Sequence, residues 1–370
     1  MKMNDDQSAN EFPAAVSPAV AEEYAAQKMA LVDFVNRAMD ADRDVAALTG
    51  DNPRQVMYTN HSNHAEFMAN VLQFSQFELL ARILPWVYNA YHAHGFSYDY
   101  FPRALSCWMD AVRALLSPAA QAPVLEVYAW MRDRHSTTVE QAEQAPTPPI
   151  ASLDGRWQEV RTAYLEAVVA GDTCQARATA EAAVHGLDDM RDFYLEVLQP
   201  VMVDIGRLWQ RGEISVAQEH LATAIAGRIM ASFYVRFMNR KPTKGAAVIT
   251  AAPNEFHELG ARMIADFLEI DGWDTAFLGA DTPAEDLIQL LRGGKHELLG
   301  ISVMMPFNLD KVGSLIAAIR AIPELAALKI MVGGGSLNLM PGLKDALRAD
   351  GFAVNAATAV TLANQWREGK

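Results

Sequence analysis

Hydrophobic positions in the first part of the chain recur at the spacing of a helix. From Met29 to Arg134 apolar side chains return every three or four residues, which predicts an all-helical N-terminal domain over residues 26–140. The same periodicity continues after a break, and it predicts a compact bundle of four or five helices over residues 153–241. The first two thirds of the chain is therefore expected to be all-α.

After Lys241 the pattern changes to short β-rich runs that alternate with amphipathic stretches. Strands separated by helical segments of this length imply βαβ units, a parallel sheet and right-handed crossovers. Residues 242–370 are therefore predicted to form a doubly wound, Rossmann-like α/β domain. The predicted strands cover residues 246–250, 275–278, 298–303 and 329–332, with a weaker one at 353–354.

Two segments lack periodicity. Residues 1–25 are polar and Ala-rich and contain Pro13 and Pro18, which predicts a mobile leader. Residues 141–152 contain three prolines among small polar residues, which predicts an extended linker and the first domain boundary.

Charge and composition narrow the class of function. The 370 residues include 31 Lys and Arg against 45 Asp and Glu, a net charge of −14 that disfavours direct binding of nucleic acid or of anionic lipid. Two cysteines are too few for a disulfide framework, and no apolar run approaches the length of a membrane helix. These features favour a cytoplasmic protein.

The loop after the first predicted strand carries the candidate chemistry. It presents His257 just before a helix, with Glu255 two residues earlier and Gly260 three residues later. A carboxylate that accepts the second N–H of an imidazole is typical of a metal-ligating histidine. A surface histidine near a helix N-terminus is the alternative.

Two later loops favour the metal-ligating interpretation over the surface histidine. The third strand ends in a motif with Ser302 and Met304, and the fourth ends in Gly333 and Gly334, where bare backbone lets a bulky ligand approach. The order E-x-H-x-x-G, S-x-M and G-G resembles the cobalamin-binding domain, whose pattern is D-x-H-x-x-G, S-x-L and G-G. The resemblance covers roughly residues 244–367.

The resemblance implies a role for each matched residue. His257 would coordinate cobalt with the cofactor's nucleotide base displaced, Ser302 would meet the displaced benzimidazole, and Gly333 and Gly334 would flank the tail. Glu255 stands where Asp is commoner and Met304 where Leu is, and both substitutions preserve the character of the site.

The helical bundle contains a second motif. Trp209 is followed after nine residues by Glu219 and His220, a spacing that resembles the bundle of cobalamin-dependent photoreceptors. In that family the Trp packs against the 5′-deoxyadenosyl group and the Glu hydrogen-bonds it. The resemblance implies adenosylcobalamin as cofactor and a light-dependent change of conformation or of homo-oligomeric state. Gln210 stands where one branch has a histidine, so a bis-histidine product is in doubt.

The N-terminal domain offers no basic recognition helix, but an aromatic and imidazole cluster occupies residues 86–108. An aromatic helix–helix core is one interpretation. The other is a pocket for a flat conjugated ligand, with Arg103 available for a propionate and His92 or His94 for pyrrole nitrogens. This architecture resembles the photocobilins, which pair cobalamin with biliverdin.

Two functions from different classes remain. The first is a non-catalytic light sensor that binds adenosylcobalamin and, in the photocobilin interpretation, biliverdin. The second is a corrinoid carrier for methyl transfer, which shares the bundle and the cobalamin domain but gains nothing from adenosyl contacts. An isomerase fragment is disfavoured because no barrel precedes the domain.

Overall fold

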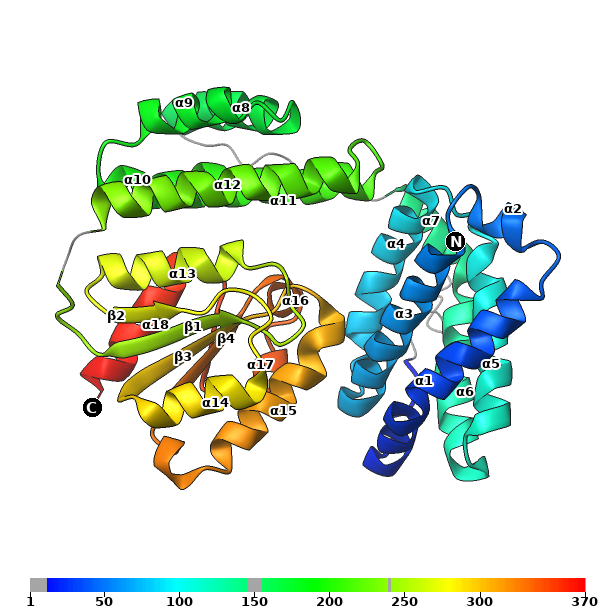
Figure 1. The fold of residues 1–370 in the computed structure, drawn as a ribbon. Coiled ribbons are helices and arrows are strands. Elements are labelled where there is room, and N and C mark those ends of the chain that lie inside the picture. Colours follow the sequence, from blue (N-terminus) through cyan, green and yellow to red (C-terminus); the bar gives the residue numbers. More distant parts are fainter. Residues whose placement is uncertain (1–11, 145–154, 239–240, 370) are drawn as a thin grey trace, which may run out of the picture. The chain divides into compact units, whose positions relative to one another are not determined.

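The computed structural model describes residues 12–144, 155–238 and 241–369. The chain divides into two compact units, Met1–Thr147 and Pro148–Lys370. Figure 1 shows helices throughout the first unit, and a helical bundle with a sheet in the second. None of the helices in these described ranges is long and apolar enough to cross a membrane.

The described part of the first unit is all-α, as the periodicity predicted. Its core is built from one face of each long helix and includes Tyr24, Trp108 and Tyr128, all at most 2% exposed. α1 packs against α3 and α5, and α4 packs against α7. The helices are α1 (Pro18–Asp40), α2 (Val45–Thr49), α3 (Arg54–Phe74), α4 (Phe77–Ala93), α5 (Tyr100–Leu115), α6 (Pro118–Asp133) and α7 (His135–Glu143).

The predicted leader over residues 1–25 is wrong in its second part. Helix α1 begins at Pro18, a residue whose fixed φ suits the first turn of a helix. Val20, Ala21 and Tyr24 lie on its buried face, so this segment belongs to the core. Residues 1–11 lie outside the described residues, as do residues 145–154, which hold most of the predicted linker.

The second unit begins with the helical bundle. Asp172 caps α9 by accepting a hydrogen bond from the Gln175 amide at 2.9 Å, and Ser215 forms a capping box with Gln218 at the start of α12. The elements are α8 (Gly155–Val169), α9 (Thr173–Ala183), α10 (Leu187–Phe193), a π-helical turn η2 (Tyr194–Leu198), α11 (Gln199–Gln210) and α12 (Val216–Phe237).

The sheet that follows has five parallel strands in the order β2-β1-β3-β4-β5. The predicted doubly wound fold is confirmed, because helices cover both faces: α13 and α18 on one and α14 and α15 on the other (Figure 1). The strands are β1 (Ala246–Ala251), β2 (Asp274–Phe277), β3 (His296–Ser302), β4 (Lys329–Gly333) and β5 (Gly351–Ala353). The helical elements are α13 (Leu259–Ile270), α14 (Ala284–Gly293), η3 (Pro306–Asn308), α15 (Leu309–Arg320), η4 (Pro323–Leu325), α16 (Gly335–Leu339), α17 (Leu343–Ala346) and α18 (Ala356–Glu368).

The strand order indicates where a ligand would bind to this sheet. Strands on the two sides of β1 are reached by connections in opposite directions, so the carboxyl ends of β1 and β3 border a topological switch point. The loop with His257 leaves β1 at this point, and Ser302 is the last residue of β3. The fold therefore gathers the predicted motifs at one edge of the sheet.

Candidate functional site

The loop between β1 and α13 brings Glu255 and His257 into contact. The Nδ1 atom of His257 lies 2.5 Å from Oε1 of Glu255, which also accepts the His257 backbone N–H at 3.2 Å. Glu255 is 1% exposed, whereas the His257 side chain is 55% exposed. With Nδ1 engaged by the carboxylate, Nε2 is the ring nitrogen that remains for a metal.

Hydrogen bonds and nearby charges favour the charged forms of Glu255 and His257. Burial by itself raises the pKa of Glu255, but hydrogen bonds from His257 and from the Met305 backbone N–H outweigh it and lower that pKa to about 2. The hydrogen bond to Glu255 raises the pKa of His257, and the Glu219 carboxylate contributes in the same direction. Glu255 is therefore an anion at neutral pH, and Glu219 of the bundle acts electrostatically on the candidate ligand.

The second oxygen of Glu255 is held by three donors. Oε2 accepts the backbone N–H groups of Met304 at 3.0 Å and Met305 at 2.8 Å, and Nδ2 of Asn308 at 3.2 Å. Asn308 is 0% exposed. Sequence reasoning missed Asn308, because a single Asn in a short Pro-Phe-Asn turn gives no signal of its distant partner.

Ser302, Gly260 and the glycine pair lie next to each other. Ser302 pairs in register with Gly333, and a Cβ atom built on Gly260 would lie 3.7 Å from the Ser302 hydroxyl oxygen. Gly334 has a φ of +100°, and a Cβ there would lie 2.4 Å from the Val303 carbonyl oxygen. The backbone itself therefore requires glycine at residue 334.

The bundle residues stand at the junction of α11 and α12. Trp209 is next to last in α11 and packs partly buried against the core, and Glu219 lies in the first turn of α12. Glu219 accepts a hydrogen bond from the Thr223 hydroxyl at 3.0 Å, and its other oxygen lies 2.6 Å from Nδ1 of His220. The His220 side chain is 74% exposed.

Exposed apolar side chains flank His257 along the chain and along the sheet edge. Phe256 is 70% exposed and Met304 is 46% exposed. Large apolar side chains held open beside an imidazole fit a broad, largely apolar ligand. The exposed imidazole and the apolar side chains beside it therefore fit a corrinoid, whose cobalt His257 would hold.

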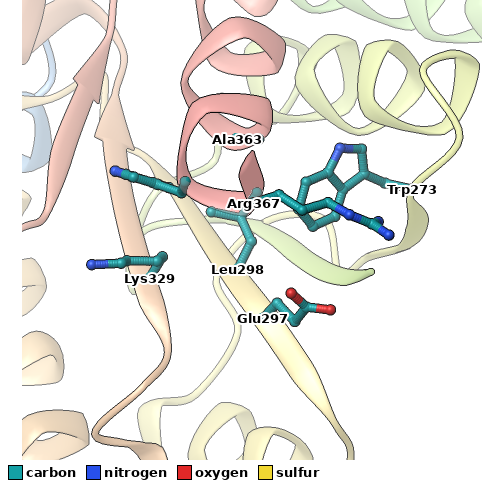
Figure 2. A pocket seen from close by; sticks show the side chains of 7 residues that line it. Trp273, Glu297, Leu298, Lys329, Ala363 and Arg367 are labelled. Atoms are coloured by element: carbon teal, nitrogen blue, oxygen red, sulfur yellow. The ribbon is translucent and has the colours of Figure 1, made fainter. Parts of the chain in front are cut away.

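A small cavity lies at the amino-terminal ends of the strands, opposite the edge that carries His257. It is lined by residues at the starts of β3 and β4 and by α18, including Trp273, Glu297 and Arg367 (Figure 2). Its volume is about 10 Å³. That is room for about one water molecule, so this cavity is not a corrinoid site.

The three predicted N-terminal residues are engaged with other groups. Arg103 forms an ion pair with Asp42. His92 bonds through Nδ1 to the Phe96 carbonyl at 3.1 Å and stacks on Tyr98 at 4.1 Å between ring centres. His94 caps the end of α4. In this structure Arg103 already pairs with a carboxylate, and the predicted contacts of these three residues with a bilin stay predictions.

The aromatic cluster around them packs largely on itself. The rings of Tyr88 and Phe101 stack at 3.6 Å between centres, and Tyr91 lies 5.2 Å from Phe101. Close ring–ring contacts of this kind are typical of a helix–helix core.

Two histidines on α3, His61 buried and His64 partly buried, escaped the sequence analysis. His61 lies between Asn36, at 2.6 Å from Nδ1, and the Tyr100 hydroxyl, at 2.8 Å from Nε2. His64 packs 4.9 Å from the Trp108 ring, and its buried Nε2 has no hydrogen-bond partner among the described residues. Burial lowers the pKa of His64 to about 3. Polar residues surround both histidines in the sequence, so no local signal marked them.

Comparison with known proteins decides the cofactor class. Residues 160–233 match one B12 binding domain model, and residues 245–361 match a second. The second unit carries B12-binding domains. The first match lies within the helical bundle and the second within the α/β domain, so both parts of the predicted cobalamin module are represented.

Individual relatives include a transcriptional repressor and several corrinoid proteins. The chain is 28% identical over 193 residues to the HTH-type transcriptional repressor CarH of Myxococcus xanthus, an alignment that covers 50% of this chain and 62% of the repressor. It is 22% identical over 223 residues to dimethylamine corrinoid protein 3 of Methanosarcina acetivorans, covering 58% of this chain and 99% of that protein. The structure of the Methanosarcina barkeri monomethylamine corrinoid protein aligns at 21% identity, covering 56% of this chain and 98% of that one, with a TM-score of 0.49.

Proposed function

We propose that this protein is a light sensor without catalytic activity of its own. It binds adenosylcobalamin base-off, with His257 as the protein ligand, and loss of the adenosyl group in light changes its conformation or its homo-oligomeric state. When bound, the cofactor supplies a weak cobalt–carbon bond that absorbs visible light. The protein supplies the binding and the structural response.

The observation that carries this proposal is the electrostatic coupling of Glu219 to His257. His257 lies in the loop after β1 and Glu219 lies on α12 of the bundle, yet the Glu219 carboxylate raises the pKa of the imidazole. The two side chains therefore lie close enough for their charges to interact. The Glu219 carboxylate can accept hydrogen bonds from the hydroxyl groups of an adenosyl moiety, whereas a methyl group has no hydrogen-bond donor.

Trp209 is assigned the role of steric reporter. It lies at the end of α11, and α11 continues from the π-helical turn that holds Tyr194. The Tyr194 hydroxyl bonds to Asp266 on α13, the helix that begins two residues after His257. A change in packing at Trp209 would thus act on helices joined to the sheet by a buried hydrogen bond, which suits a two-state switch.

A corrinoid carrier for methyl transfer is the second candidate. It is favoured by the alignments with methylamine corrinoid proteins, which cover 99% and 96% of two of those relatives. The two functions differ in the upper ligand that they need. Protein reconstituted in darkness with adenosylcobalamin or with methylcobalamin is illuminated and followed by size-exclusion mass and hydrogen exchange. A sensor responds fully only with the adenosyl form, and equal responses would favour the carrier.

We extend the proposal to biliverdin as a second chromophore in the N-terminal unit. The support is the buried Nε2 of His64, which lacks a partner within residues 12–144, beside the rings of Trp108 and Tyr128. Co-expression with a biliverdin source is expected to give red absorption beyond the cobalamin bands. His64→Leu should reduce it more than His92→Leu or His94→Leu. Absence of red absorption in the wild type returns this cluster to an ordinary helical core.

A further inference from the structure

The face of α13 that meets the bundle carries polar side chains, whereas the buried face of a helix is ordinarily apolar. Arg262, Asp266 and Glu269 recur there at helical spacing. Arg262 donates to a backbone carbonyl of α12 at 3.4 Å. Asp266 accepts a hydrogen bond from the Tyr194 hydroxyl at 2.9 Å. Glu269 accepts one from the Tyr234 hydroxyl at 3.0 Å. Two tyrosine–carboxylate contacts therefore join the bundle to α13.

Apolar packing also joins the two parts. The contacts of Arg262 with Gly227 and of Glu269 with Tyr234 each connect residues 35 positions apart, so α12 and α13 run side by side in the same direction (Figure 1). Phe267 of α13 and the buried residues of α12 belong to one apolar core cluster. Apolar burial therefore favours the closed interface.

Two polar groups oppose this closure. Asp266 is 4% exposed, and its carboxylate is charged when it is not protonated. The Tyr164 hydroxyl on α8 is buried and has no hydrogen-bond partner within residues 12–144, 155–238 and 241–369, and Tyr164 acts electrostatically on Tyr194. A buried charge and an unpaired buried hydroxyl both cost free energy that contact with water would remove. The closed interface is therefore a balance between apolar burial and polar desolvation.

Charged and titratable groups surround Asp266 from several elements. Burial outweighs the hydrogen bond from Tyr194 and the charge of Arg262, and it raises the pKa of Asp266 from 3.8 to about 6. The groups are Tyr164 on α8, Arg191 on α10, Tyr194 on η2, Tyr234 on α12, and Arg262 and Glu269 on α13, with Asp274 of β2 acting on Glu269. β1 also contacts α13 and contains no charged residue, and the charged residues of α18 are Arg367 and Glu368 in its last turn.

We propose that this interface is a proton-linked latch, in which a proton on the Asp266 carboxyl holds the bundle closed on α13 and loss of that proton favours its separation. Protonation removes the buried charge and still leaves an oxygen that accepts from Tyr194. The latch acts between parts of the chain itself, so it does not depend on a bound cofactor.

The direction of the pH effect follows from the tighter hold on the proton in the closed form. Stabilisation of the closed form by this proton is fully present below about pH 4 and is lost as pH rises through about 6. The pKa of Asp266 lies at about 6 when it is buried and at 3.8 in water. A difference of about two units corresponds to a change of up to about 100-fold in the ratio of closed to separated protein.

Pulsed electron paramagnetic resonance measures the separation directly in the full-length chain. One spin label replaces Val235, an 85% exposed residue of α12, and the other replaces the exposed Gln289 of α14. The two free cysteines are removed by Cys107→Ser and Cys174→Ser. A control pair places both labels in the α/β domain, at Gln289 and at the exposed Thr361 of α18. Thermal unfolding checks that each variant is folded at each pH.

The ratio of separated to closed protein is expected to rise about tenfold between pH 5 and pH 8. Asp266→Asn is neutral at both pH values and should keep the low-pH distance distribution at both. Tyr194→Phe should keep the pH dependence with a higher midpoint, because the lost hydrogen bond lowers the pKa of Asp266. Asp345→Asn, on α17 and paired with Lys344, is the control and should follow the wild type.

Three results would overturn the latch. The first is a wild-type distance distribution that does not change between pH 5 and pH 8. The second is Asp266→Asn that separates with pH as the wild type does, or Glu269→Gln that loses the pH dependence while Asp266→Asn retains it. The third is an equal change at the control pair, since the α/β domain would then be rearranging as a whole.

Discussion

The Tyr194 hydroxyl donates a hydrogen bond of 2.9 Å to the Asp266 carboxylate, and this buried contact joins the helical bundle to the sheet domain. Tyr194 lies in the π-helical turn of the bundle, and Asp266 lies in the middle of α13. Tyr194 is 0% exposed and Asp266 is 4% exposed. A carboxylate buried with one hydrogen-bond donor is a costly group, so its protonation should affect stability.

The first prediction concerns the pH dependence of this contact. Burial raises the pKa of Asp266 from 3.8 to about 6, although Tyr194 and Arg262 oppose the shift. Because the folded protein binds this proton more tightly than the unfolded chain, the contribution to stability is present below about pH 4 and is lost as pH rises through about 6. Asp266→Asn should therefore be more stable than wild type at pH 8, by up to about 3 kcal/mol.

Urea unfolding at several pH values measures this difference. The gain from Asp266→Asn should shrink to near zero at about pH 4, where the wild-type carboxyl is protonated. Asp345→Asn, at an exposed carboxylate on α17 that pairs with Lys344, is the control for the substitution itself. A gain of equal size at all pH values would mean that packing, not ionisation, distinguishes the variant.

The second prediction concerns Gly334. Its φ of +100° disfavours any side chain, and a Cβ would lie 2.4 Å from the Val303 carbonyl oxygen. Gly334→Ala should therefore destabilise the second unit by about 1–3 kcal/mol and disturb the loop beside Ser302. Gly342→Ala is the matched control, since Gly342 has a φ of −63° and its Cβ would meet no atom within 4 Å. Equal unfolding midpoints for the two variants would contradict the strain argument.

The third prediction concerns the candidate cobalt ligand. His257→Ala removes the imidazole of this loop while leaving Ser302 and the glycines in place, so cobalamin should bind more weakly and without the base-off, His-on spectrum. His220→Ala is the comparison, because this largely exposed imidazole is the neighbouring histidine on the bundle. A variant at residue 257 with the wild-type spectrum and affinity would remove His257 from the site.

The fourth prediction concerns Trp209. Trp209→Ala deletes the proposed adenosyl contact without touching His257, so affinity should stay close to that of the wild type. The difference between dark and illuminated protein in hydrogen exchange should become smaller, because fewer packing interactions depend on the adenosyl group. Trp209→Phe should keep more of the difference than Ala does. A full light response in Trp209→Ala would exclude this residue from the mechanism.

Local patterns predicted most of the second unit, because its signals lie close together in sequence. The alternation of β-rich and amphipathic segments placed all five strands within two residues of their observed bounds, although the weak prediction at 353–354 overlaps β5 only at Ala353. The contact between Glu255 and His257 spans two residues, so spacing alone suggested it.

Contacts between distant residues could not be read in this way. Asn308 lies 53 residues from Glu255, and Tyr194 lies 72 residues from Asp266. The predicted leader failed for another reason. Alanines make up much of the first turns of α1, and they pack against a core without producing a clear hydrophobic period, so Tyr24 was the one strong apolar signal of the buried face.

The visible absorption spectrum of protein reconstituted with adenosylcobalamin in darkness, recorded before and after green light, tests the central claim most directly. A light sensor of the proposed kind should show a base-off spectrum with His257 as ligand in darkness, and should convert to a hydroxo- or aquo-type spectrum on illumination with a parallel change in size-exclusion mass or hydrogen exchange. A spectrum that bleaches with no change in the protein, or that bleaches identically with His257→Ala, would contradict the account.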